Sequence, residues 1–89
     1  MEILDLSNFD TSKVTNMAQM FANCNNLKTI YASDKFVTTN VTGDNAMFLS
    51  SSNLVGSSGT KYSASHIDKE YARIDGGTAN PGYFTLKSN

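Results

Sequence analysis

The chain has 89 residues, one cysteine and a formal net charge of −1. That length fits one small domain, and the weak net charge without a basic run gives no electrostatic basis for binding nucleic acid or an anionic membrane, so we expect neither as a partner. Asn, Ser and Thr make up 30 of the 89 residues, which favours a turn-rich β or solenoid structure over a helical bundle.

The first predicted element is a short strand over Leu4–Leu6, where apolar and polar residues alternate. A polar loop containing Phe9 follows. Thr15 is a candidate N-cap for a short helix, and residues 23–26 end that helix because asparagine tolerates the left-handed conformation. The helix is predicted from apolar residues at spacings of three and four, namely Val14, Met17, Phe21 and Cys24.

This pattern returns further along the chain, with Phe9 matched by Phe36 and Met20 by Met47. The matching strand, Ile30–Ala32, comes one position earlier than these matches predict, so the second loop carries one inserted residue. A fixed period in the twenties indicates a solenoid, whose units bury their apolar faces against each other. The second copy is less apolar, as expected for the terminal repeat of an array; it has Asp44, Asn45 and Ser51 where the first has Met17, Ala18 and Cys24.

The period stops after Leu54, and a flexible link over residues 55–60 follows. Ser65 is predicted to open a short helix, with Asp68 in its capping box and Gly76-Gly77 at its end. After the turn Asn80-Pro81-Gly82, residues 83–86 alternate like an edge strand. We interpret this segment as a cap over the last unit.

The run from Leu4 to Met17, continued by Met20-Phe21, Cys24 and Leu27, resembles the BspA-type leucine-rich-repeat surface proteins of bacteria. The segment from Leu54 to Thr85 is similar to the unit that closes such arrays. The resemblance implies an α/β solenoid: a leucine-rich-repeat fragment of about two strand–loop–short-helix turns over residues 1–56, with a C-terminal capping segment over residues 57–89.

The same resemblance implies a non-enzymatic structural or interaction module that closes the repeat array of a cell-surface or secreted protein. The parent would act in adhesion or host-protein binding. The family offers no catalytic residues to carry over, and we expect no cofactor. No apolar run approaches the length of a membrane span, so we expect no membrane insertion. Members of the resembled family hold many repeats, whereas this sequence shows about two and no visible signal peptide or wall anchor, so we expect a C-terminal fragment of a longer protein.

Two surfaces are candidates for binding a protein partner. Asp5 and Tyr31 lie mid-strand in the two units and should stand side by side on the open face of the sheet, which repeat proteins use for partners. The N-terminal side lacks a neighbouring unit, and we expect end-to-end self-association there through Leu4, Leu6 and Phe9.

Two chemical alternatives stand beside these interpretations. Cys24 and His66 could serve a Cys/His-dependent hydrolase or redox protein, although a cysteine on an apolar stripe is more often core filling. His66 and Glu70 could share a helix face for a metal, and Asp75 begins a loop with some calcium-site character, but neither has enough ligands at a recognisable spacing. We therefore expect no metal site and no catalytic residue.

Overall fold

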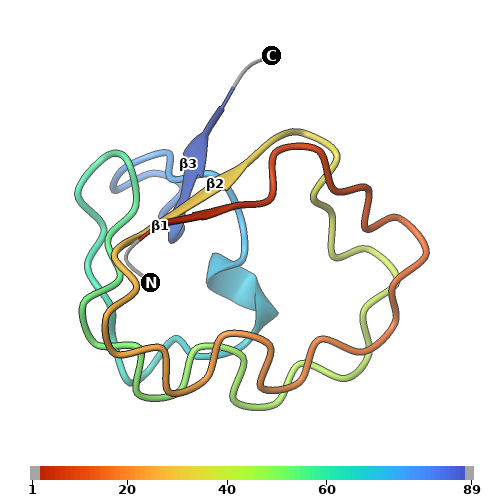
Figure 1. Cartoon of the computed structure of the whole chain (residues 1–89), viewed down its shortest axis with the longest axis horizontal. Helices are drawn as coiled ribbons and strands as arrows, with labels where there is room; N and C mark the ends of the chain where they lie inside the picture. The colour runs from red at the N-terminus through yellow and green to blue at the C-terminus, as the bar shows by residue number, and fades with distance from the viewer. Residues whose placement is uncertain (1–2, 88–89) are drawn as a thin grey trace.

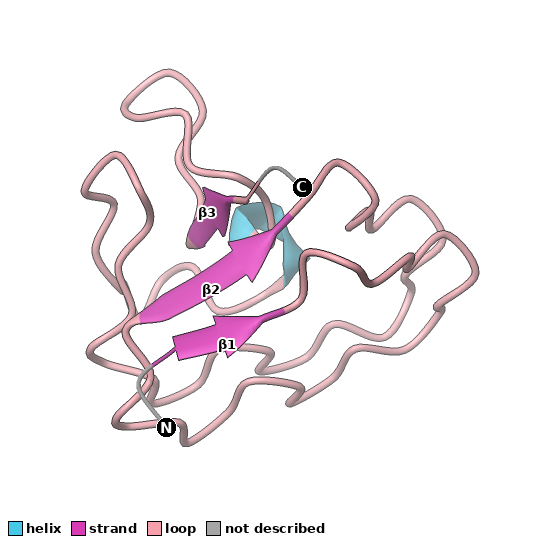
Figure 2. Ribbon diagram, turned by 45° about the horizontal axis from the view of Figure 1, so that its top comes forward, coloured by secondary structure: helices cyan, strands magenta, loops and turns pink. Residues whose placement is uncertain are grey.

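The computed structural model describes residues 3–87 and places three short strands in one parallel sheet. They are β1 (Ile3–Asp5), β2 (Thr29–Ala32) and β3 (Phe84–Leu86), in the order β1-β2-β3 (Figure 2). β1 pairs with β2 in a register that sets Leu4 opposite Ile30 and Asp5 opposite Tyr31. The predicted short parallel pairing of the two repeat strands is confirmed, and the predicted edge strand joins the same sheet.

Alternation of side chains across the sheet separates a core side from an outer side. Ile30, Ala32 and Phe84 are completely buried, whereas Asp5 is exposed and Tyr31 is half-buried on the other side. Each large apolar side chain buried in this way contributes roughly 1.5–3 kcal/mol. The predicted division of the strands into inward and outward positions is therefore correct.

The first predicted helix does not form, and residues 3–87 contain no α-helix. Residues 17–23 form successive turns in which Gln19 and Asn23 have left-handed φ values of 59° and 60°. Their counterparts Ala46 and Ser50 have φ values of 56° and 64°. A left-handed residue at every fourth position interrupts a right-handed helix but still places side chains four positions apart on one side. The turns thus reproduce the apolar spacing of a helix.

A ladder of backbone hydrogen bonds replaces the helical bonds. Amides of the first turn segment donate to carbonyls of the second at 2.6–3.0 Å, in the pairs Met17–Gly43, Gln19–Asn45, Phe21–Met47 and Asn23–Leu49. Amides used in this way cannot bond four positions back, as a helix requires. The first unit (residues 3–28) and the second unit (residues 29–54) therefore run side by side in parallel (Figure 1).

The tail (residues 57–87) packs on the second unit and returns to the sheet through β3. Its helical content in the described residues is the 3-10 helix η1 (Lys69–Tyr71), which Asp68 caps. The longer helix predicted for this segment is wrong, because the backbone from Arg73 onward bonds to Phe84 instead of continuing a helix. Within residues 3–87, no helix has the length and apolar character needed to cross a membrane.

Aromatic rings from all three segments meet in the core. Phe21 stacks on Phe48 with ring centres 5.3 Å apart, and Tyr83 contacts Phe48 edge-on at 4.9 Å. Phe84 contacts Phe36 edge-on at 4.7 Å. The described chain measures 29 × 28 × 28 Å, so its overall shape has no long axis.

Candidate functional site

The outer face of the sheet brings Asp5 and Tyr31 together, as predicted, because they are register partners in adjacent strands. The structure adds Thr85 beside Tyr31 and places Lys87 against both candidate residues. Lys87 Nζ lies 2.6 Å from Asp5 Oδ2 and 5.6 Å from the centre of the Tyr31 ring. This face therefore carries an ion pair beside an aromatic ring.

Hydrogen bonds fix the charge state of this face. The bond from Lys87 holds the pKa of the Asp5 carboxyl well below its usual range, and Ser7 adds two more bonds through its hydroxyl and amide. Asp5 in turn raises the pKa of Lys87. Both groups are charged at neutral pH. Since each side chain is close to half exposed, solvent and salt screen the pair.

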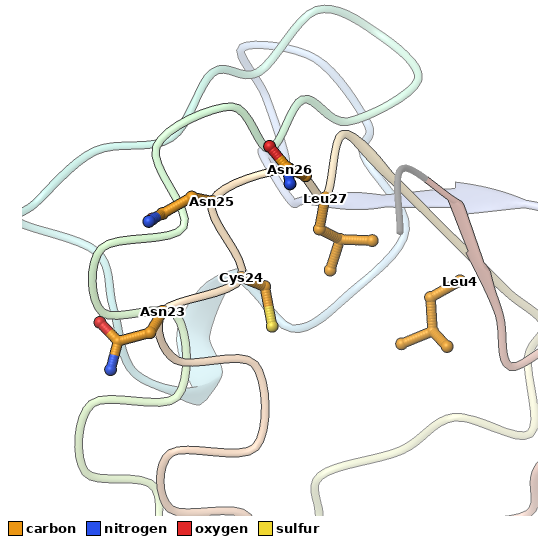
Figure 3. Close-up of a pocket in the computed structure, with 6 residues that line it drawn as sticks. All are labelled: Leu4, Asn23, Cys24, Asn25, Asn26 and Leu27. Carbon is orange, nitrogen blue, oxygen red and sulfur yellow. The ribbon is translucent and has the colours of Figure 1, made fainter.

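A pocket of about 290 Å³ lies at the edge of the first unit and is lined by that unit alone (Figure 3). The side chains of Leu4, Cys24 and Leu27 point into it, whereas the amide groups of Asn23 and Asn25 point away (Figure 3). The pocket therefore combines an apolar interior with an asparagine-rich rim.

Counterparts in the two units differ in exposure. Phe9 is 53% exposed and Met20 42%, whereas Phe36 and Met47 are 8% and 0% exposed. Three more first-unit side chains are half-buried where their second-unit counterparts are buried, in the pairs Leu4–Ile30, Val14–Val41 and Cys24–Ser51. We call the five first-unit residues that are less buried than their second-unit counterparts the N-terminal face: Leu4, Phe9, Val14, Met20 and Cys24. Leu6 was predicted to belong to it, but Leu6 is buried.

The tail provides hydrogen-bond acceptors for backbone amides of the second unit. In the same way, the second unit provides acceptors for the corresponding amides of the first unit. Phe48 and Ser50 are the counterparts of two first-unit ladder donors. Their amides donate to Ile67 O at 3.2 Å and to Tyr62 Oη at 3.1 Å. Lys69 adds a bond from its ammonium group to a second-unit carbonyl at 2.7 Å. The tail thus covers the edge of the second unit that lies away from the first.

Asp75 is a buried carboxylate that ties loops of the tail together. It accepts bonds from the amides of Ser58, Thr60 and Gly77 and from the Thr60 hydroxyl, at 2.7–3.0 Å. Burial raises its pKa, but these bonds outweigh burial and lower the pKa to about 2. Because the groups of residues 3–87 that bond to this carboxylate are donors, they stabilise its anionic form and do not form the shell of oxygen ligands that calcium requires.

Cys24 and His66, the predicted catalytic alternative, lie in different surroundings. Cys24 Sγ lies 3.6 Å from Ala22 O, whereas His66 stacks on Tyr71 with ring centres 4.2 Å apart and contacts Glu70 at 3.1 Å. Both belong to the described part of the chain, and no hydrogen bond joins them. Between residues 3 and 87, no group of three or more His, Cys, Asp or Glu side chains is placed to hold a metal.

Sequence reasoning missed the role of Ser51. It looked like a polar replacement of Cys24 in a decaying repeat, yet Ser51 is completely buried. Its hydroxyl donates to Phe21 O and accepts from the Cys24 amide at 3.3 Å. The sequence signal for this role was a small hydroxyl residue at a repeat position that is otherwise apolar. Lys87 and Tyr62 had no comparable signal.

A parallel, turn-rich two-unit body closed by a tail is thus the class of structure that the chain defines. The chain belongs to the family described as "Mycoplasma protein of unknown function, DUF285", whose model matches residues 3–79. The match covers both units and most of the tail. Comparisons with curated proteins and with solved structures found no match.

Proposed function

We propose that this chain is a non-enzymatic module that closes the C-terminal end of a leucine-rich-repeat solenoid in a bacterial surface protein. DUF285 is found in BspA-like surface proteins, which supports a cell-surface or secreted location and a parent acting in adhesion or protein binding. In this proposal, the first and second units are the last two repeats and the tail is their cap. The outer face with Asp5 and Tyr31 is the candidate partner-binding surface.

The observation that carries the proposal is the way the tail covers the second unit. The tail provides acceptors for the amides of Phe48 and Ser50, and it also provides an apolar cover. Tyr83 is completely buried, its ring contacts Phe48, and its hydroxyl donates to His66 O at 2.9 Å. Terminal repeats need such a cover because an open apolar edge promotes association.

Tyr83→Ala tests the closing role, with Asp75→Asn as a matched control within the tail. Tyr83→Ala removes a large buried ring and should cost about 4 kcal/mol. It should also uncover Phe48, so the folded variant should bind an apolar dye and self-associate in sedimentation. Asp75→Asn should destabilise the chain without either effect, because it leaves the apolar cover in place. A folded Tyr83→Ala variant that stays monomeric and binds no dye would contradict the proposal.

A further inference from the structure

We propose that the outer face of the sheet binds a lysine side chain of a partner protein between the Asp5 carboxylate and the Tyr31 ring, and that Lys87 is a built-in competitor for this position. The inference rests on the proposed partner-binding role of this face, and it adds the chemistry of the partner and a means of regulation. Its basis is the way in which the chain already places one of its own ammonium groups there.

The carboxylate of Asp5 is held in place by a buried residue. Ser7 is 3% exposed, and its amide and hydroxyl donate to Asp5 Oδ1 at 2.9 and 2.6 Å. These two bonds orient the carboxylate, whose Oδ2 accepts from Lys87 Nζ at 2.6 Å. An ammonium group can make a charge-assisted bond to a single oxygen, whereas the arginine fork gains most when both oxygens are available. The arrangement therefore suits a lysine better than an arginine.

The ring of Tyr31 supplies a second contact for the same cation. Asp5 and Tyr31 are register partners on β1 and β2, and Lys87 Nζ lies over the ring at 5.6 Å from its centre. A cation within about 6 Å of the centre of an aromatic ring is attracted by the negative charge on the ring face. A carboxylate and a ring that share one ammonium group thus form a small site for a basic side chain.

Lys87 reaches this site from the opposite edge of the sheet. It follows β3, and β2 lies between β3 and β1 (Figure 2), so the lysine side chain crosses the middle strand to contact Asp5. The backbone amide of Lys87 donates to Ala32 O at 2.9 Å, and this bond holds the strand end independently of the side chain. The lysine side chain can therefore leave Asp5 while the sheet stays closed.

The contact made by Lys87 is weak enough for a partner to displace it. The side chains of Lys87 and Asp5 are 44% and 43% exposed, and solvent and salt screen ion pairs of this exposure. Displacement of such a pair should lower the apparent affinity for an external lysine by about two- to fivefold. Lys87 thus tunes the affinity of the outer face without blocking it.

The test titrates the folded chain with the peptide acetyl-Gly-Lys-Gly-amide and follows the NMR signals of Asp5 and Tyr31. Lys87→Gln should bind the peptide about two- to fivefold more tightly than the original chain. Lys13→Gln is the matched control, because it removes the same charge from a loop of the first unit, and it should bind like the original chain. A peptide whose lysine is acetylated lacks the charge and should bind to none of these proteins.

The two sides of the site are tested in the Lys87→Gln background. Asp5→Asn should abolish the response to the peptide. Tyr31→Leu should weaken binding, whereas Tyr31→Phe should keep most of it because the ring face remains. A urea titration of each variant checks that the fold is retained.

Equal affinities of the original chain and Lys87→Gln would overturn the competitor role, and binding that survives Asp5→Asn or acetylation of the peptide would overturn the cation site. Absence of binding by every variant would overturn the whole proposal. Changes in the Tyr31 signals that grow with protein concentration, without peptide, would assign the site to a lysine of a second copy and reject a different partner protein.

The Tyr83→Ala comparison reports on the core beneath the tail and does not depend on the outer face. Dye binding and self-association of Tyr83→Ala, alongside absent lysine binding, would leave the closing role intact and reject only the partner chemistry proposed for the sheet. Lysine binding as expected, with a Tyr83→Ala variant that stays monomeric and binds no dye, would reject the closing role alone.

Discussion

Asp75→Asn should lower the free energy of unfolding by about 3 kcal/mol at pH 7. Hydrogen bonds lower the pKa of Asp75 from 3.8 to about 2, a difference worth about 2 kcal/mol in favour of the anion in the folded state. The asparagine side chain carries no charge. Its NH₂ group must face either the backbone N–H of Gly77 or the backbone N–H groups of Ser58 and Thr60. Such opposed donors add about 1 kcal/mol or more.

The pH dependence gives a second readout of the same residue. Because the pKa is lower in the folded state, the stabilisation is fully present above the unfolded pKa of about 3.8 and is lost as pH falls through about 2. The original chain should therefore lose about 2 kcal/mol more than Asp75→Asn between pH 5 and pH 2. Asp5 and Asp10 also have lowered pKa values, but they are present in both proteins and cancel in the comparison.

Urea titrations followed by far-UV circular dichroism at pH 7, 5, 3 and 2 measure both quantities. Asp75→Glu serves as a companion variant that keeps the charge but displaces the carboxylate. Parallel stability profiles for the original chain and Asp75→Asn over this pH range would refute the reasoning. They would mean that the carboxylate is not selectively stabilised by the donors around it.

Three further outcomes are expected. Phe36→Ala should lower the free energy of unfolding in urea by about 3 kcal/mol or more, and Phe9→Ala by less than about 1 kcal/mol, because the two side chains are 8% and 53% exposed. Equal losses would contradict the difference in burial between the two units. Gly56→Ala should destabilise by about 2 kcal/mol or more, since its Cβ would lie 2.5 Å from Asp75 Oδ2, and an unchanged thermal midpoint would reject this packing. Lys87→Ala should lower the thermal midpoint slightly in low salt and leave it unchanged in about 1 M salt, because Lys87 pairs with the exposed Asp5; a salt-independent shift would contradict an ionic contribution.

The repeat made the sheet predictable from the sequence. Alternation over Leu4–Leu6 and Ile30–Ala32 marks the inward positions, and the offset between these two strands sets Asp5 opposite Tyr31. The same apolar spacing misled the helix prediction, because turns with a left-handed residue every four positions also place Met17 and Phe21 on one side. The two structures differ in backbone conformation and in the partner of each ladder amide, and that partner lies in the other unit.

The contacts of the tail were not predictable in the same way. Lys87 reaches Asp5 across 82 residues, and Asp75 binds the Ser58 amide across 17 residues. Neither pair repeats, so no period in the sequence connects its members. From the sequence, Asp75 could only be described as the start of a loop with some calcium-site character, because a carboxylate near glycines does not reveal which backbone amides will surround it.

Amide hydrogen exchange tests most directly whether the tail closes the second unit. The amides of Phe48 and Ser50 bond to the tail, whereas those of Phe21 and Asn23 bond within the two-unit ladder. If the tail takes the place of a further unit, Phe48 and Ser50 should be protected to nearly the same degree as Phe21 and Asn23. Exchange of Phe48 and Ser50 at the rate of exposed amides, with Phe21 and Asn23 still protected, would show that the second unit is open and that the tail is not its cap.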